Sequence, residues 1–125
     1  MGGYETAVES RNHQLLMDFN TEQKDANAES YIFFLNSGYY HLNRNELNTA
    51  QWEFFRALSI NSYGKGARIG LTRTLIAQCK AYQKECENIK EQLDFLGSMK
   101  YLPIEEIEEM ERQVVYPKQK NIEAI

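Results

Sequence analysis

The sequence predicts one all-α domain, in which antiparallel helical hairpins stack as a short right-handed superhelix of about five or six helices. Along most of the 125-residue chain, apolar residues recur at intervals of three and four positions, which is the period of a helix that buries one face. Only two prolines and seven glycines interrupt the chain, and no segment alternates apolar and polar residues as a β-strand does. Because the breaks between helical segments are short, consecutive helices are expected to be antiparallel neighbours.

The composition excludes several classes of protein. Hydrophobic residues make up 42% of the chain and charged residues 26%, which is typical of a globular domain and not of a disordered chain. With a net charge of -4 and a pI of about 5.2, the chain lacks the basic surface that binds nucleic acid. It has no apolar run of about 18 residues that could span a membrane and no signal-peptide pattern at its start. We therefore expect a cytoplasmic protein without nucleic-acid or membrane partners.

Two helices are expected in the first third of the chain. The first covers residues 7–24, where one face is apolar. Its apolar residues are Leu15, Leu16, Met17 and Phe19. The second covers residues 28–43 and is much more apolar. One of its faces carries Tyr31, Phe34, Leu35, Gly38 and Leu42. Phe33 and Tyr40 lie elsewhere on its circumference, a distribution typical of a helix that packs between neighbours.

Four more helices are expected after this pair. They cover residues 46–60, 65–80, 84–97 and 103–115. Asn43-Arg44-Asn45 precedes the first of them as a turn, because asparagine tolerates left-handed backbone, and Asn61-Ser62-Tyr63-Gly64 ends it. Pro103 begins the last helix, since proline suits the first turn. Residues 116–125 are expected to form a flexible tail.

The only two cysteines, Cys79 and Cys86, are seven positions apart. On one continuous helix they would lie about 10 Å apart along the axis, beyond the reach of a disulfide. A turn between them would bring them closer, so a bridge stays open as an alternative. The simpler interpretation is two buried free thiols in a reducing compartment.

Residues 31–64 resemble a tetratricopeptide repeat (TPR), whose length is 34 positions. In this register the positions of small residues are occupied by Gly38, Ala50 and Ala57, and those of large aromatic residues by Phe34 and Phe54. Small residues let the two helices of a hairpin approach closely, while the aromatic rings fill the space between them. The chain is thus similar to TPR proteins over about a quarter of its length.

Residues 65–98 resemble a degenerate second repeat. Gly70 or Thr72 would be its small residue, and its second helix lacks the alanines. Matching the second helix of this repeat, 84–97, to that of the first, 46–60, requires an insertion in the turn that precedes residue 84. The match pairs Leu47, Ala50, Phe54 and Ala57 with Cys86, Ile89, Leu93 and Leu96. The helices at 7–24 and 103–115 would then cap the ends, which repeat proteins need for solubility.

The resemblance implies a module for binding proteins, an adaptor or a chaperone-like domain. TPR proteins bind peptides or partner helices in a concave groove lined by the first helix of each hairpin. Carried over by position, the groove residues are Ile32, Leu35, Asn36, Tyr39, Leu42 and Asn43, with Arg68 or Arg73 from the second hairpin. Some TPR proteins hold a terminal carboxylate with a set of Lys and Asn side chains. That set is missing here, because Leu35 and Tyr39 occupy positions where it needs Lys and Asn. The resemblance therefore implies an apolar peptide or helix as the partner.

Two other occupants of the groove stay open. Leu15, Leu16 and Phe19 of the first helix could fill it from within the chain. A second copy could also cover the aromatic face in a homodimer. In either case the protein would be a structural, self-associating helical protein without a free groove.

No motif indicates catalysis. His13 and His41 are the only histidines, and neither has a partner at a catalytic or metal-binding spacing. Gly64-Lys65-Gly66 follows a helix, whereas a phosphate-binding loop follows a strand and has a longer pattern. The glutamates between positions 105 and 111 lie opposite an apolar stripe and are expected to face water. We expect no enzymatic activity, no catalytic residue, no cofactor and no metal.

Overall fold

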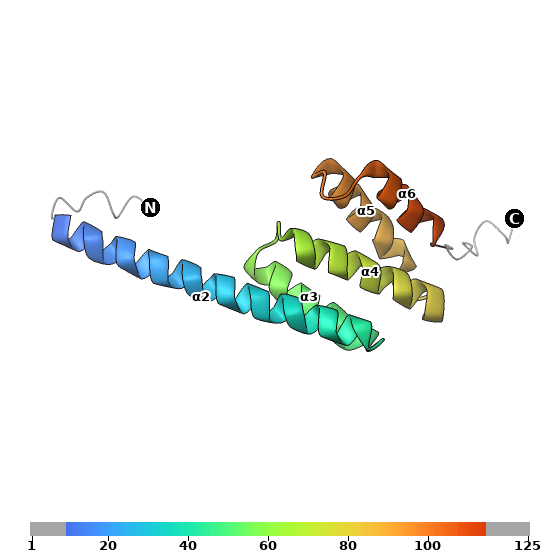
Figure 1. Cartoon of the computed structure of the whole chain (residues 1–125), viewed down its shortest axis with the longest axis horizontal. Helices are drawn as coiled ribbons and strands as arrows, with labels where there is room; N and C mark the ends of the chain where they lie inside the picture. Colours follow the sequence, from blue (N-terminus) through green and yellow to red (C-terminus); the bar gives the residue numbers. More distant parts are fainter. Residues whose placement is uncertain (1–9, 115–125) are drawn as a thin grey trace, which may run out of the picture.

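The computed structural model describes the backbone of residues 10–114 and the side chains of residues 26–114. This part of the chain is all-helical, as predicted, and contains no strand. Its elements are α2 (Ser10–Asn43), α3 (Leu47–Ile60), α4 (Lys65–Tyr82), the 3-10 helix η1 (Cys86–Asn88), α5 (Ile89–Ser98) and α6 (Ile104–Arg112). In Figure 1, α2, α4 and α6 form the near layer, and α3 and α5 lie behind them.

One long helix takes the place of the two that were predicted at the start of the chain. The expected break between residues 24 and 28 is absent, because α2 continues from Ser10 to Asn43. The sequence from 20 to 30 is polar but contains neither glycine nor proline, so nothing in it ends a helix. The prediction of a separate helix over residues 7–24 is therefore wrong. The apolar side chains that were expected to fill the groove lie outside the described side chains.

The later helices lie close to their predicted positions. Asn45, in the predicted turn, adopts left-handed backbone with a φ of 62°, which asparagine tolerates better than most residues. The last helix, α6, follows Pro103 as expected and buries Ile107 and Met110 against the core. It thereby covers the end of the stack next to α5, the role expected of a cap. The predicted tail, 116–125, lies outside the described residues.

The core of the first hairpin is centred on Phe54 of α3, which is fully buried. Its ring lies between two glycines, Gly38 of α2 and Gly70 of α4. A Cβ atom added at Gly38 would lie only 2.6 Å from the ring, and one at Gly70 would be closer still. The ring of Tyr39 packs edge-on against Phe54, with 4.9 Å between the ring centroids. Three helices can approach at this point because neither glycine has a side chain.

The two hairpins bury equivalent positions, which supports the predicted match between them. Each matched residue is at most 5% exposed: Leu47 with Cys86, Ala50 with Ile89, Phe54 with Leu93, and Ala57 with Leu96. Along the first helices, Thr72 lies 34 positions after Gly38, whereas Cys86 lies 39 positions after Leu47. The turns before the two second helices have three residues each, 44–46 and 83–85, so the additional residues lie at the end of α4, which continues ten positions past Thr72, whereas α2 continues five past Gly38. The insertion that the sequence match placed in the turn is therefore found as a longer first helix.

Cys79 and Cys86 form a disulfide, so the expectation of two free thiols is wrong. α4 ends at Tyr82, and after it Gln83 and Glu85 adopt left-handed backbone, with φ values of 54° and 67°. These two residues reverse the chain and bring the cysteine Cα atoms to 4.9 Å from each other. The structure therefore adopts the alternative in which a turn separates the cysteines. Both are buried, and the bridge joins the end of α4 to η1.

Candidate binding surface

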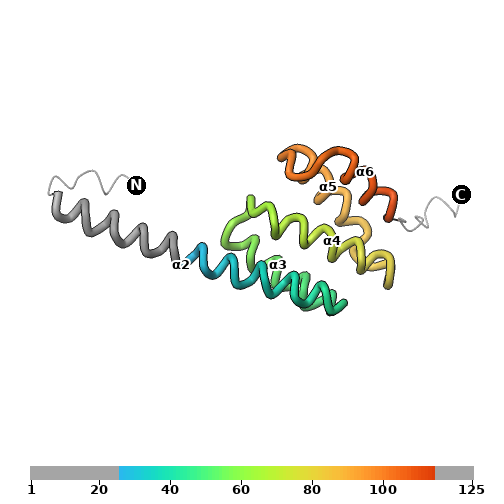
Figure 2. Tube along the Cα trace, viewed as in Figure 1, coloured from blue at the N-terminus to red at the C-terminus, as the bar shows by residue number. Residues whose placement is uncertain are grey.

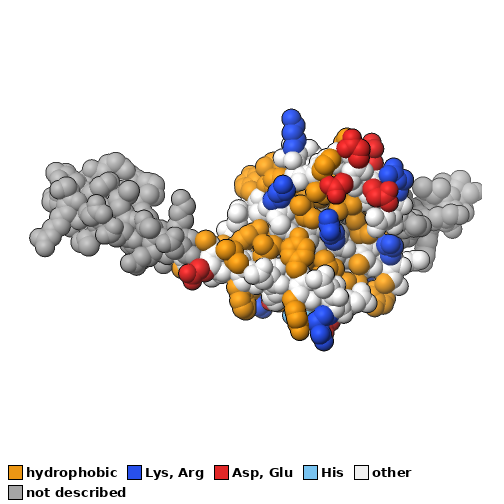
Figure 3. All heavy atoms as spheres, in the orientation of Figure 1, with side chains coloured by type: hydrophobic (Ala, Val, Ile, Leu, Met, Phe, Trp, Pro, Cys, Tyr) orange, Lys and Arg blue, Asp and Glu red, His pale blue; other side chains and the backbone are white. Residues whose placement is uncertain are grey.

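The first helices of the hairpins, together with α6, present one continuous surface, which we call the α2/α4/α6 face. Figure 3 shows this face with its side chains. Hydrophobic side chains collect around its middle, and acidic side chains gather over α6. The predicted groove residues can therefore be placed relative to this face one by one.

Three of the predicted residues on α2 are free to meet a partner. Ile32 is 52% exposed although its side chain is apolar. Asn36 and Asn43 are also exposed. Asn36 and Asn43 are seven positions apart and therefore share one side of the helix. Ile32 and Tyr39 are also seven positions apart, so Ile32 lies on the side of α2 whose Tyr39 contacts α4.

Three other predicted residues, Leu35, Tyr39 and Leu42, are partly buried and hold α2 against the rest of the chain. Leu35 and Leu42 pack against the core cluster. The Tyr39 hydroxyl donates a hydrogen bond of 2.6 Å to the carbonyl oxygen of Gly66 in α4. Burial raises the pKa of Tyr39, because the charged phenolate would lose its water, while the positive charge of Arg73 opposes the rise. These three side chains therefore hold α2 in place, and only a small part of each is exposed to a partner.

The two predicted arginines point in different directions. Arg68 donates from Nε to the carbonyl oxygen of Ser62 at 3.1 Å and from a terminal nitrogen to Oε1 of Gln92 at 3.2 Å. Its guanidinium also lies 4.2 Å from the ring centroid of Phe95. Arg68 therefore belongs to the contact between α4 and α5 and does not line the predicted groove. Of the two positions that the sequence left open, only Arg73 lies on the α2/α4/α6 face.

An open hollow of about 340 Å³ separates α4 from α6 on this face. Its lining consists of Arg73, Ile76, Glu106, Glu109, Met110 and Gln113. Ile76 and Met110 are buried and provide an apolar floor. Among the described residues, Arg73 has no hydrogen bond or ion pair, so its charge is available to a partner. The α4 wall is thus basic and the α6 wall acidic, a feature that the sequence pattern did not indicate.

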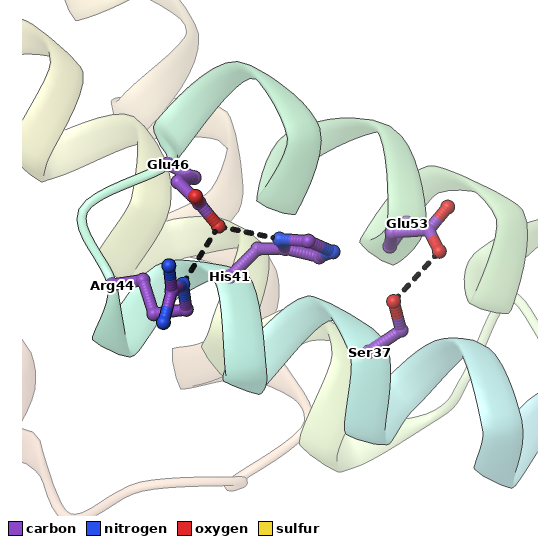
Figure 4. Close-up of polar contacts among 5 residues, drawn as sticks. All are labelled: Ser37, His41, Arg44, Glu46 and Glu53. Carbon is purple, nitrogen blue, oxygen red and sulfur yellow. Dashed lines mark hydrogen bonds and ion pairs between the residues drawn. The ribbon is translucent and has the colours of Figure 1, made fainter.

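A polar network on another side of α2 fastens the first hairpin (Figure 4). Ser37 donates a hydrogen bond of 2.8 Å to Glu53 of α3. Beside it, Nδ1 of His41 lies 2.7 Å from Oε1 of Glu46, which Nε of Arg44 also approaches at 3.4 Å. His41, which was considered as a functional residue and discounted, thus serves as a hydrogen-bond partner at the end of α2.

The hydrogen bond with His41 is the main reason why the pKa of Glu46 lies below its ordinary value of 4.5, and Arg44 adds to the effect. A lowered folded-state pKa favours folding above the pH at which the unfolded glutamate titrates, and this contribution is lost as the pH falls through the folded-state pKa. We expect the NMR titration midpoint of the Glu46 carboxyl to lie below that of an ordinary glutamate. In a His41→Ala variant the midpoint should rise. An unchanged midpoint in that variant would show that His41 is not the cause.

Several large aromatic side chains lie exposed away from the α2/α4/α6 face. Phe33 is 65% exposed and Tyr40 is 58% exposed. Trp52 of α3 is also exposed, and the guanidinium of Arg56 lies 5.8 Å from its ring centroid and 5.7 Å from that of Phe34. The apolar pattern of residues 28–43 led to the expectation of a helix that packs between neighbours, but among the described residues Phe33 and Tyr40 contact only nearby residues of the same hairpin, such as Phe34 and Arg44.

Within residues 26–114, no three side chains of His, Cys, Asp or Glu are grouped as metal ligands would be. No helix of the described chain is long and apolar enough to cross a membrane. No protein-family model, curated protein or solved structure matches this chain. Its function has to be inferred from its own residues.

Proposed function

We propose that this protein is a TPR-like interaction module, which binds a peptide or helix of another protein on the α2/α4/α6 face. The observation that carries the proposal is the repetition of the hairpin. The second helices bury equivalent residues at four matched positions, from Leu47 with Cys86 to Ala57 with Leu96. Repeated hairpins of this kind place their first helices side by side, and the aligned helices form an extended surface for a partner.

The side chains on this face indicate the chemistry of the partner. Ile32 and the floor of the hollow, formed by Ile76 and Met110, favour apolar side chains. Arg73 favours an acidic or amide group next to them, and the carboxylates of Glu106 and Glu109 favour a basic group on the α6 side. The partner segment is therefore amphipathic, with an apolar side chain flanked by charges of opposite sign. Binding needs no catalytic group, in keeping with the expectation that the protein is not an enzyme.

Changing either of two exposed side chains on the face, Ile32 and Arg73, should weaken this binding. Random peptides displayed on phage are selected on the immobilised protein, and the affinities of the enriched peptides are then measured by fluorescence anisotropy. We expect Ile32→Glu and Arg73→Glu each to weaken binding by about tenfold or more, because the removal of an interface anchor commonly costs at least about 1.4 kcal/mol.

Lys90→Glu provides the matched control, because it reverses the same charge at an exposed position of α5, in the other layer. It should leave peptide affinity unchanged. If the enriched peptides bind wild type and both face variants equally well, this face is not the binding surface. If the selection yields no specific peptide, the proposed function fails.

The alternative proposal is a homodimer in which a second copy covers the α2/α4/α6 face. The exposure of an apolar residue, Ile32, within this face favours it. Tyr39 is unsuitable for testing the dimer, because its ring packs on Phe54 and its hydroxyl bonds to Gly66. Ile32→Glu would break such a dimer in sedimentation equilibrium, whereas it would leave the oligomeric state unchanged in a module whose face is free.

The disulfide changes the proposal about location. The expectation of two free thiols in a reducing compartment agreed with a cytoplasmic location, and the Cys79–Cys86 bridge removes that agreement. Disulfides form and persist in oxidising surroundings, and they are rare where glutathione and thioredoxin keep thiols reduced. We therefore propose that the chain folds in an oxidising compartment.

A further inference from the structure

Helix α2 extends beyond the helices that cover it. Every side chain from Ala26 to Ser30 is exposed, whereas from Tyr31 onward one side of the helix packs against the core. Figure 2 shows the described part of α2 reaching past α3. The whole helix has 34 residues, whereas α3 has only 14. Most of the stability of a helix in a protein comes from packing, so a second helix that covered the exposed part of α2 would stabilise it.

One face of α2 has the pattern of a helix-pairing surface. Ala26, Phe33 and Tyr40 follow each other at intervals of seven positions and therefore share a face. Ser30 and Ser37 lie between them at the intervening positions of a heptad. Ser37 lies at the edge of this face and donates a hydrogen bond to Glu53 of α3. Phe33 and Tyr40 are both more than half exposed, so the side of the face that carries the two rings is apolar and uncovered.

We propose that a second copy of this chain covers this face. The two α2 helices pair antiparallel about a twofold axis that passes between positions 29 and 30. In this register position 26 of one copy faces position 33 of the other, so each Phe33 ring meets the small side chain of Ala26. The interface is self-complementary, as a twofold axis requires, because both copies provide one large and one small residue.

The shape of the molecule agrees with this arrangement. α3 contacts only the C-terminal part of α2, through pairs such as Ser37 with Glu53 and Gly38 with Phe54. In an antiparallel pair, the helices α3–α6 of one copy and those of the other therefore lie at opposite ends of the paired α2 helices and do not collide. Parallel α2 helices would place both sets at the same end.

This interface is distinct from the α2/α4/α6 face. Phe33 and Tyr40 each follow a residue of the proposed binding surface by one position, Ile32 and Tyr39, which places them about 100° further around the helix. A dimer through Phe33 therefore leaves Ile32 and Arg73 free. Either proposal can fail without the other.

Sedimentation equilibrium on the full chain tests the dimer. We expect wild type to be a dimer at about 100 µM and Phe33→Glu to dissociate at least about tenfold more readily, because both copies lose the contact of Phe33 with Ala26 and gain a charge in an apolar interface. Ile104→Glu on α6 is the control, since Ile104 is 58% exposed, close to the 65% of Phe33, but lies on another helix. It should remain a dimer. Circular dichroism checks that both variants stay helical. A monomeric wild type, or a dimer that Phe33→Glu does not weaken, overturns the proposal.

Cross-linking tests the orientation of the two helices. The native cysteines are already joined to each other, so a single added cysteine reports only on contacts between copies. Ser30→Cys lies next to the axis and should form a disulfide-linked dimer under mild oxidation. Two copies of Tyr40→Cys would be about 30 Å apart in the antiparallel pair and should not react. A linked dimer of Tyr40→Cys, or none for Ser30→Cys, contradicts the antiparallel arrangement.

Discussion

Replacing Phe54 by alanine should lower the free energy of unfolding by about 3–5 kcal/mol, the usual effect of removing a buried aromatic ring. The ring is fully buried and contacts three helices, through Gly38, Gly70 and Tyr39. These neighbours cannot move in to close the cavity, since two of them are glycines without side chains. Urea denaturation followed by circular dichroism measures the change directly.

The neighbouring residue provides the control for this prediction. Phe55 follows Phe54 on the same helix but is 44% exposed, so Phe55→Ala should cost well below 3 kcal/mol, with helix propensity altered in the same way. If the two variants are equally destabilised, Phe54 is not the centre of the hairpin packing. The stacking of α2 and α4 on α3 would then have another basis.

A second substitution tests the contact itself. Gly70→Ala should destabilise wild type by about 1–3 kcal/mol, because its Cβ would collide with the Phe54 ring. In the Phe54→Ala background the ring is absent, and alanine is the better helix former. The same change should then be neutral or stabilising. Equal effects in both backgrounds would show that the two residues do not interact.

The local pattern of the sequence was sufficient to predict the hairpins. The buried positions of α3 repeat at intervals of three and four, and the turn before it contains Asn45, whose left-handed backbone asparagine tolerates. The small residues Ala50 and Ala57 are fully buried, as close packing of helices requires. These features depend on neighbours within a few positions, so their signal lies in a short stretch of sequence.

The features that the sequence did not reveal depend on contacts between distant segments. The choice between Arg68 and Arg73 rests on the position of Phe95 and Gln92 in α5. The hollow on the face needs α4 and α6 to come together. The polar stretch inside α2 was read as a break, although a long helix can cross such a stretch when no residue ends it.

Removing the disulfide should have the second large effect. The Cys79–Cys86 bridge closes a short loop around the left-handed residues Gln83 and Glu85. Limiting the unfolded chain in this way stabilises a folded protein by about 2–3 kcal/mol for a loop of roughly eight residues, in the chain-entropy description. The double variant Cys79→Ala/Cys86→Ala, or reduction of wild type with dithiothreitol, should lower the urea midpoint accordingly. If neither treatment changes the midpoint, the bridge contributes nothing to stability.

The position of the bridge also predicts which helices lose stability when it is reduced. It holds the turn that leads from α4 to α5 and α6, whereas α2 and α3 are held together by Phe54, Glu53 and Glu46, far from the sulfur atoms in sequence. Amide hydrogen exchange on the reduced protein should therefore accelerate in α5 and α6 before it does in α3.

Because α6 forms one wall of the hollow, reduction should also weaken peptide binding at Arg73. Exchange that rises equally in all helices would instead indicate that the bridge stabilises the chain as a whole. In either case, a stabilising bridge at this turn supports folding in an oxidising compartment, because a chain kept reduced would lose it.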